Sequence, residues 1–388
     1  LPAPITDMNF KIQCEGQACH VDFLNMKMGS NGCRVKGALH GWRPLQGDLS
    51  LASDHLHVSE LIPEHLFSRM EKGVSAPSKG FMQDAHIGVK LDVQKADWKE
   101  VDFGPVQALC AIRGGDLYVN QAEIGLPYGR TRFKGHLKRG KNPQAAVSTY
   151  VNLTRVPIKR LPQMLDPVKE YVEGDLSLEA LVYLQGANAE AWLSSLTGGA
   201  NILIEKGVIK RSNIFIKILD FLSLKELFTR DEDGSSGKGL KFDKIEGPVD
   251  LENGIAQVEQ MRLRGPVLNA VGRGKVDLFQ KTVDGEVGVE PLGTLDLVIS
   301  HLPIVGHLLT GDKKALYVDY FKVEGPLSDP DVRYIPFKSL GSGTVGFIKR
   351  LFLSPGRLYK NISDRKRDFE RRGLPLPDNL QPEKDMGP

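Results

Sequence analysis

Two histidines, His55 and His57, stand two residues apart in the segment "LASDHLHV" (51–58). On a strand, this spacing puts both imidazoles on one face, where they can bind one metal ion. A metal site needs a third and a fourth ligand, and the surrounding sequence shows neither. We therefore interpret both as ordinary polar histidines and predict no metal site.

The chain has four cysteines, and Cys14 and Cys19 flank "EGQA", whose composition is typical of a hairpin turn. Two interpretations stay open: a disulfide across the hairpin, formed in an oxidising compartment, or two small strand residues. The CxxxxC spacing is not typical of zinc sites, and no second pair completes one.

The segment "GSGTVG" (341–346) has the spacing of a dinucleotide-binding loop, but no βαβ unit surrounds it. We interpret it as a flexible joint before the last helix. The sequence contains no GxSxG, HExxH or Walker motif and no paired carboxylates of catalytic spacing. We therefore predict a protein that is not an enzyme and has no cofactor.

The composition is that of a folding chain, with 388 residues, 26% charged and 41% hydrophobic. A net charge of +3 does not indicate a nucleic-acid partner. No apolar run approaches the roughly 20 residues of a membrane span. Because the chain begins at Leu1 and shows no signal peptide, we expect a longer protein whose membrane anchor lies upstream.

One sequence unit occurs three times without a gap. Its copies are "HVDFLNMKMGSNGCRVKGAL" (20–39), "YVNQAEIGLPYGRTRFKGHL" (118–137) and "QVEQMRLRGPVLNAVGRGKV" (257–276). Apolar and polar residues alternate on both sides of a turn-like centre, which predicts a β-hairpin with one apolar face. A strand-like run and a proline follow each copy, and "TLDLVISHL" (294–302) is the third of these return strands.

Each copy carries a glycine on its apolar face, at Gly37, Gly135 and Gly274. A glycine there marks either a β-bulge or a place where the sheet bends around what fills its apolar side. We predict that the three glycines bend a groove. The residues predicted to line it are Leu24, Met26, Val35, Leu39, Ile124, Leu126, Phe133, Leu137, Leu176, Leu178, Val182, Leu184, Leu263, Val276, Leu295 and Leu297.

Helix is expected only over 59–72, 212–228 and 344–372. The second of these is apolar around most of its surface, so it either covers the groove as a lid or plug, or is a plain core helix. The third is basic and partly amphipathic, so it either lies on an anionic membrane or is a solvated helix. The residues predicted as lid or membrane contacts are Ile214, Ile218, Phe221, Leu222, Phe347 and Phe352.

A sheet with one apolar face must cover that face, and so little helix cannot cover a long sheet. The sheet either closes into a sandwich or barrel, or curls into a trough that holds an apolar ligand. The glycines favour curling. We predict a mainly β fold: an elongated, twisted antiparallel sheet, curled into an open apolar groove built from repeats, with a few short helices.

Three segments resemble the C-terminal part of the AsmA-like family of bacterial envelope proteins, close to the repeating-β-groove, bridge-like lipid transfer proteins. They are "SSLTGGANILIEKGVIKR" (194–211), "GPVDLENGIAQVEQMRLRGPVLNAVGRGKVDL" (247–278) and "LPIVGHLLTGDKKALYVDYFKVEGPLSDPDVRYIP" (302–336). The resemblance is best over 190–360. It departs at the N-terminus, where the family's membrane helix and first repeats are missing.

This resemblance implies a periplasmic segment of an inner-membrane-anchored bridge, which carries phospholipids between the inner and outer membranes. The implied partners are phospholipids, both membranes and other envelope proteins, and no nucleic acid. Two alternatives stay open: an assembly factor that binds partner strands at its sheet edges, and, more distantly, a closed β-sandwich enzyme or sugar-binding module. The predicted domains are two groove units (1–190), an AsmA-like groove unit (191–340), a basic helix (341–373) and a disordered tail (374–388).

Overall fold

The computed structural model describes most of the chain, and every structural statement below concerns the part that it describes. The described residues are 4–42, 44–61, 84–98, 101–126, 128–139, 145–161, 171–210, 213–222, 239–292, 307–311, 314–336, 352 and 360–377. The chain forms two compact units, which we describe separately. Unit 1 comprises Leu1–Arg155, Glu179–Gly198 and Asn361–Pro388, and unit 2 comprises Val156–Leu178 and Gly199–Lys360.

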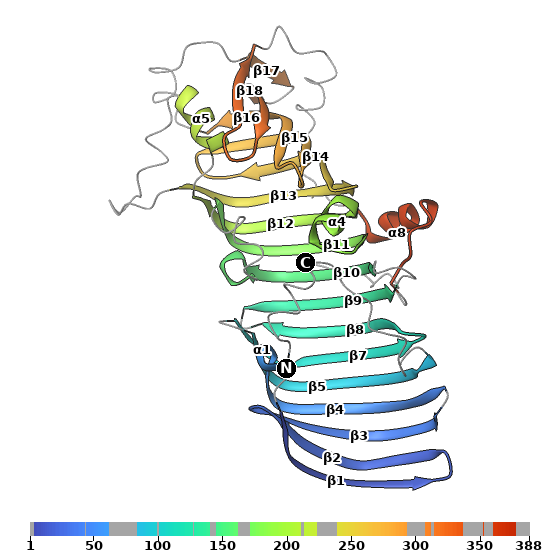
Figure 1. Ribbon diagram of the computed structural model, residues 1–388. Coiled ribbons are helices and arrows are strands. Elements are labelled where there is room, and N and C mark those ends of the chain that lie inside the picture. Colours follow the sequence, from blue (N-terminus) through green and yellow to red (C-terminus); the bar gives the residue numbers. More distant parts are fainter. Residues whose placement is uncertain are drawn as a thin grey trace. The chain divides into compact units, whose positions relative to one another are not determined.

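Unit 1 is built on a β-sheet whose strands follow one another in chain order and do not close into a barrel (Figure 1). Tight turns join most neighbours, so the alternating sequence pattern becomes a meander. The strands are β1 (Ile5–Glu15), β2 (Ala18–Met28), β3 (Asn31–Trp42), β4 (Leu45–His57), β5 (His86–Trp98), β6 (Val101–Phe103), β7 (Val106–Arg113), β8 (Asp116–Leu126), β9 (Gly129–Arg139) and β10 (Ala145–Pro157).

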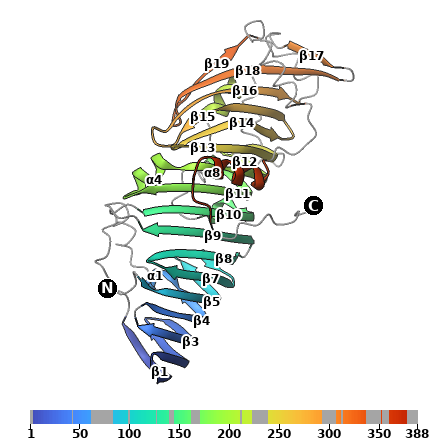
Figure 2. The ribbon, with the colours of Figure 1, turned by 90° about the vertical axis from the view of Figure 1, so that its right-hand side faces the viewer.

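Unit 2 contains a second series of paired strands, which Figure 2 shows in hydrogen-bonded order from β13 to β19. They are β13 (Leu240–Glu252), β14 (Ile255–Arg264), β15 (Leu268–Asp277), β16 (Thr282–Pro291), β17 (His307–Gly311), β18 (Lys314–Pro326) and β19 (Asp331–Ile335). Two further strands, β11 (Val172–Gly186) and β12 (Thr197–Ile209), contribute residues to both units. The predicted fold class, mainly β with few short helices, is confirmed.

The described helices are short. They are α1 (Val58–Leu61), a 3-10 turn (Ile158–Arg160), α4 (Ala189–Ser195), α5 (Asn213–Phe221) and α8 (Ile362–Arg371). Helices α5 and α8 lie within two of the predicted helical segments, 212–228 and 344–372. Helix α1 overlaps the start of the third, 59–72, whose residues 62–72 lie outside the described part of the chain. The predicted joint at 341–346 lies outside the described residues.

The prediction of an entirely antiparallel sheet was wrong at one place. Strands β4 and β5 pair in parallel, with Leu49 opposite Val89 and His57 opposite Asp97. Parallel neighbours require a crossover connection rather than a hairpin. In the sequence, residues 58–85 join the two strands, and the parallel direction of β5 was not evident from periodicity.

The three sequence copies share one structural device, a β-bulge at the same position. In each copy a valine on the first strand pairs with the repeat glycine: Val21 with Gly37, Val119 with Gly135, and Val258 with Gly274. Directly after each valine the register shifts, because two residues on the first strand oppose one on the second. Strands β2, β8 and β14 carry this extra residue against their preceding neighbours too.

The glycine opposite the bulge has a steric reason in two of the copies. Gly37 and Gly274 have φ values of +147° and +157°, which side chains rarely adopt. A Cβ added at Gly37 would lie 2.1 Å from the Asp48 carbonyl oxygen on the next strand. At Gly135 the space is taken instead by the ring of Phe133, 2.8 Å from such a Cβ. The bulge interpretation is therefore confirmed, and bending of a groove stays a prediction.

The third copy differs from the other two in its return strand. The strand paired with β15 is β16, which includes "TVDGEVGVE". The predicted return strand, 294–302, lies outside the described residues. Glycines and acidic residues are depleted in strands, so the composition of β16 does not mark it as a strand.

Cys14 and Cys19 form a disulfide across the β1–β2 hairpin. They are direct cross-strand partners, with their Cα atoms 4.0 Å apart, and Gly16 supplies the left-handed conformation of the turn between them. Of the two interpretations left open by the sequence, the disulfide is the one that the structure contains.

The disulfide closes a short loop, and the length of this loop determines how much the disulfide is expected to stabilise the protein. Because loop closure removes little entropy from an unfolded loop of about six residues, we expect Cys14→Ser/Cys19→Ser to lower stability by about 2 kcal/mol. Hydrogen exchange should locate the effect in the β1–β2 hairpin. Cys33→Ser, at a free cysteine, is the control for loss of a sulfur atom. Unchanged protection of the hairpin in the double variant would contradict this expectation.

Candidate functional site

The candidate site of unit 1 is the apolar face of its sheet. Paired residues on neighbouring strands point to the same face, so the registers define continuous rows that run across the strands. One of them, the glycine row, crosses every long strand from β2 to β10. Its members are Val21, Gly37, Leu49, Val89, Cys110, Val119, Gly135 and Thr149.

Three further rows flank the glycine row, and each contains residues from the sequence prediction. The Phe133 row is Leu24, Val35, Leu51, Leu91, Ala108, Ala122, Phe133 and Val151. The Leu137 row is Cys19, Leu39, Gly47, Ile87, Ile112, Leu117, Leu137 and Val147. The Ile124 row is Ser53, Val93, Val106, Ile124, Thr131 and Leu153.

The structure brings the predicted lining residues of the first two copies onto this one face. Met26 pairs with Cys33, and Leu126 closes the β8–β9 hairpin opposite Gly129. Most large side chains of the rows are half-buried, and Leu137 is 39% exposed. The face therefore has apolar surface that a ligand can still cover. Burial raises the pKa of the thiols of Cys33 and Cys110, which lie on this face as small apolar residues.

The opposite face is polar, and cross-strand pairs of charges occupy it. Lys11 lies 2.7 Å from Asp22 between β1 and β2, and this ion pair lowers the pKa of Asp22. Ser50, between two members of the rows on β4, is exposed. The sheet therefore has the two chemically distinct faces that the alternation predicts.

Helix α8 packs on this second face rather than on the apolar rows. Phe369 of α8 and Leu181 of β11 are fully buried against each other, and Tyr150 contacts them from the opposite side of β10 to Val151. Leu374 and Leu376 join the same cluster. Residues at the start of the predicted disordered tail are thus part of unit 1, because two leucines anchor them.

The basic helix has internal partners for part of its charge. Arg371 lies 3.6 Å from Asp368, Arg367 pairs with Asp364, and Arg365 is buried. Phe352 is half-buried, and Phe347 lies outside the described residues. Contact of this segment with a membrane stays a prediction.

Unit 2 has its own apolar rows, and α5 covers them. Ile218 and Leu219 of α5, and Leu222 directly after it, are buried in one cluster with Leu263 of β14 and Phe321 of β18. Val276, another predicted lining residue, is half-buried on β15. In the described part of the chain, the apolar face of unit 2 is therefore covered by helix α5.

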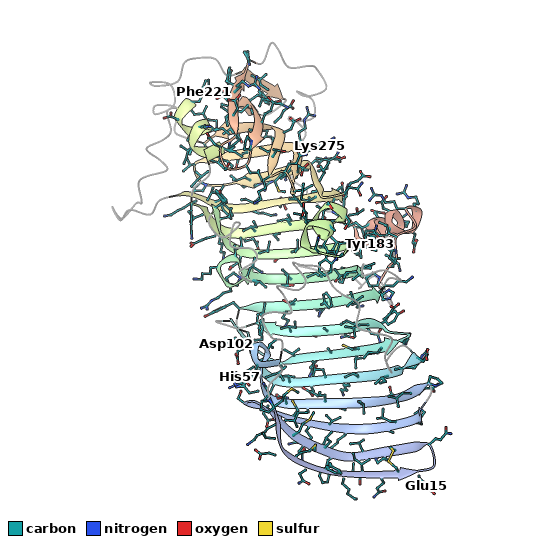
Figure 3. All side chains as sticks on the ribbon, in the orientation of Figure 1. Glu15, His57, Asp102, Tyr183, Phe221 and Lys275 are labelled. Atoms are coloured by element: carbon teal, nitrogen blue, oxygen red, sulfur yellow. A yellow bond between two sulfur atoms is a disulfide. The ribbon has the colours of Figure 1, made fainter. Side chains whose placement is uncertain are left out.

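The exposed end of α5 is aromatic. Phe221, which Figure 3 labels, is 42% exposed. It stacks on Tyr334 with ring centroids 4.8 Å apart and meets Phe321 edge-on at 5.4 Å. Ile214 packs at the margin of the same cluster. This arrangement suits either a core helix or a plug, and the role of α5 as a lid or membrane contact stays a prediction.

A buried carboxyl group lies among the apolar residues of unit 2. Asp319 pairs with Val289 across β16 and β18 and is 3% exposed. Within the described part of the chain, its Oδ2 atom has no hydrogen-bond partner. Burial raises the pKa of Asp319 to about 6, so ionisation at neutral pH destabilises the fold.

This shift predicts a pH dependence of stability. The folded-state pKa lies above the ordinary value of 3.8, so the folded state holds the proton more tightly and stability falls as pH rises from about 4 to about 6. We expect Asp319→Asn to stabilise the protein by up to about 3 kcal/mol at pH 7.5 and to flatten this dependence. Urea unfolding at pH 5 and pH 7.5 measures both effects. Asp329→Asn, at an exposed carboxyl, is the control, and an equal pH dependence in Asp319→Asn and wild type would contradict the prediction.

The remaining predicted residues have mixed positions. Leu176, Leu178, Val182 and Leu184 alternate along β11 and are half-buried, and Leu295 and Leu297 lie outside the described residues. The sequence did not indicate one side-chain cluster: His55 and His57 converge on Asp97 of β5. No local motif indicates this, because Asp97 is brought close only by the parallel pairing of β4 and β5.

In the described part of the chain, no helix has the length and apolar character needed to span a membrane. No curated protein and no solved structure matches the chain. The family described as "YhdP protein" matches residues 8–332, which is most of the chain. Together with the repeated hairpins and the two-faced sheet, this match assigns the chain to a family: it belongs to the YhdP family, within the AsmA-like bridge lipid transfer proteins.

Proposed function

We propose that this chain is a segment of a lipid-conducting bridge, and that phospholipid acyl chains contact the apolar rows of unit 1. The observation that carries the proposal is the continuity of these rows from strand to strand. The YhdP family membership supports the same function. The transported lipid would be phospholipid, and the route would lead across the periplasm between the inner and outer membranes.

The apolar rows are better suited to letting an acyl chain move along them than to binding it tightly at one place. Apolar burial contributes about 0.8 kcal/mol for each CH₂ removed from water, which offsets much of the cost of taking a lipid out of a bilayer. Similar side chains recur on each strand, and neighbouring strands lie about 4.8 Å apart. Neighbouring positions along a row therefore have similar affinity for an acyl chain. An acyl chain can therefore slide along the rows while its headgroup stays in water.

This mechanism is passive and requires no catalytic residue. The sheet supplies an apolar path, and any direction or energy comes from other components. Inner-membrane anchoring through an upstream segment is part of the proposal and follows from the family resemblance. The phospholipids and the two membranes are the proposed partners, with other envelope proteins as further ones.

A second candidate, binding of a partner strand, is favoured by one observation. β1 is exposed along its whole length, and Ile5, Met8 and Phe10 are each more than half exposed. An exposed strand with apolar side chains can pair with another chain. This alternative predicts a bound peptide instead of a bound lipid.

Native mass spectrometry followed by lipid extraction separates the two candidates. The proposal predicts that phospholipid co-purifies with the chain from a bacterial envelope and is lost when the rows carry charges. A stoichiometric peptide without lipid would support strand binding instead. Absence of lipid from a folded, envelope-expressed chain would contradict the lipid-bridge proposal.

A further inference from the structure

The side chains of His55, His57 and Asp97 converge at one end of strands β4 and β5. The Nε2 atom of His55 lies 2.8 Å from Asp97 Oδ2, and the Nδ1 atom of His57 lies 2.6 Å from the same oxygen. The two imidazole rings are 4.2 Å apart. Three potential ligand atoms thus lie within 4.8 Å of one another.

Strand register explains why these groups meet. His55 and His57 follow Ser53 on the apolar face of β4, and His57 is the direct partner of Asp97. Figure 3 shows His57 at the end of its strand, beside α1. Lys95, opposite His55, is exposed and has room to keep its ammonium group in water. The cluster therefore lies at one edge of the apolar face, beyond the Ile124 row, where solvent can reach it.

Hydrogen bonds with the side chain of Asn31 hold the backbone of His57 in place. Asn31 is fully buried, and its Oδ1 atom accepts a hydrogen bond from the His57 backbone N–H at 2.5 Å. Its Nδ2 group donates to the His57 carbonyl oxygen and to Glu60. The Glu60 carboxylate also accepts hydrogen bonds from the backbone N–H and the hydroxyl of Ser30. These hydrogen bonds to Ser30 lower the pKa of Glu60, which remains a carboxylate close to the cluster.

We propose that His55, His57 and Asp97 bind one divalent transition metal ion, and that Zn²⁺ suits the site best. Two imidazole nitrogens and one carboxylate oxygen are a common zinc ligand set, with water in the fourth position. Each imidazole offers its lone pair when its proton sits on the other ring nitrogen. In a tetrahedral site with bonds of about 2.0–2.1 Å, ligand atoms lie about 3.3 Å apart. Each imidazole nitrogen therefore needs to move away from Asp97 Oδ2 by only about 0.5–0.7 Å.

The second imidazole distinguishes this cluster from the other histidine–carboxylate pairs among the described residues. His20 lies 3.3 Å from Asp22 and His136 lies 3.4 Å from Asp116, but each pair has one imidazole. Only an arrangement with a second imidazole and a fixed backbone offers a metal three ligands. A bound metal would link β4 to β5, the parallel pair that no tight turn connects.

Isothermal titration of untagged, chelator-stripped full chain with ZnCl₂ tests this site, and Co²⁺ absorption reports the ligand geometry. We expect one ion per chain and a rise in the melting temperature with added Zn²⁺. His55→Ala and Asp97→Asn should each lower the affinity by at least about tenfold, because even the loss of a supporting hydrogen bond typically costs about 10–100-fold. His20→Ala, which removes an exposed histidine beside a carboxylate, should bind like wild type.

Both variants replace partly exposed side chains, and melting curves without metal check that they stay folded. His55 is the more exposed of the two histidines, so its variant remains informative if Asp97→Asn unfolds. The proposal is overturned if the wild type binds neither Zn²⁺ nor Co²⁺ stoichiometrically. Equal binding by the wild type and His55→Ala would overturn it as well.

Discussion

Leu51→Asp should reduce lipid occupancy of the chain at least about tenfold. Leu51 lies in the Phe133 row between Val35 and Leu91, at the middle of the apolar face. A carboxylate there either stays ionised beside the acyl chain or takes up a proton, and burying an unpaired charge costs several kcal/mol. About 1.4 kcal/mol already corresponds to a tenfold change in affinity. Quantifying phospholipid per chain after envelope purification measures the effect.

The neighbouring position on the same strand offers a matched control. Ser50→Asp adds the same carboxylate one residue earlier, but on the polar face, where Ser50 is exposed. We expect this variant to retain wild-type lipid. Circular dichroism and melting curves establish whether both variants are folded. Equal lipid contents of folded Leu51→Asp and Ser50→Asp would show that the rows are not the lipid path.

Gly37→Ala should destabilise unit 1 by at least about 2 kcal/mol. The backbone at Gly37 has a φ of +147°, where a side chain costs about 1–3 kcal/mol of strain. The added Cβ would also lie 2.1 Å from the carbonyl oxygen of Asp48 and 3.0 Å from the Leu49 Cα atom. Backbone atoms cannot move aside as a flexible side chain can, so β3 and β4 must separate locally. Urea unfolding measures the loss.

Gly32 is the control for a glycine substitution in the same strand. A Cβ at Gly32 would meet no atom of the described structure within 4 Å, and its φ is not in the left-handed range. Gly32→Ala should therefore be neutral or slightly stabilising, because alanine reduces the entropy of the unfolded chain. If Gly37→Ala and Gly32→Ala have the same stability, the steric account of the repeat glycine is wrong.

Periodicity predicted the parts of this fold that depend on neighbouring residues. The alternation over 20–39 and 118–137 gave the hairpins, the polar and apolar faces, and the row positions of Val35 and Phe133. The gap-free alignment of the three copies also placed Gly37, Gly135 and Gly274 at equivalent positions. These features are local, so a single sequence contains enough information to predict them.

Contacts between segments that are far apart in the sequence could not be predicted from sequence patterns. The parallel direction of β5, and with it the approach of Asp97 to His57, depends on a crossover rather than on a turn. The side of the sheet on which α8 packs depends on Leu181 and Phe369, more than 150 positions apart in the sequence. The glycine-rich β16 lacks the composition of a strand and is held by its neighbours on both sides.

Site-specific photocrosslinking along β4 tests the central claim most directly. A photoreactive amino acid is placed in turn at Leu49, Ser50, Leu51 and Ala52 in the chain expressed in a bacterial envelope, and crosslinked phospholipid is counted. The account predicts crosslinks at Leu49 and Leu51, which lie on the apolar rows, and none above background at Ser50 and Ala52. Crosslinks that do not alternate along the strand, or none at any position in a folded chain, would contradict it.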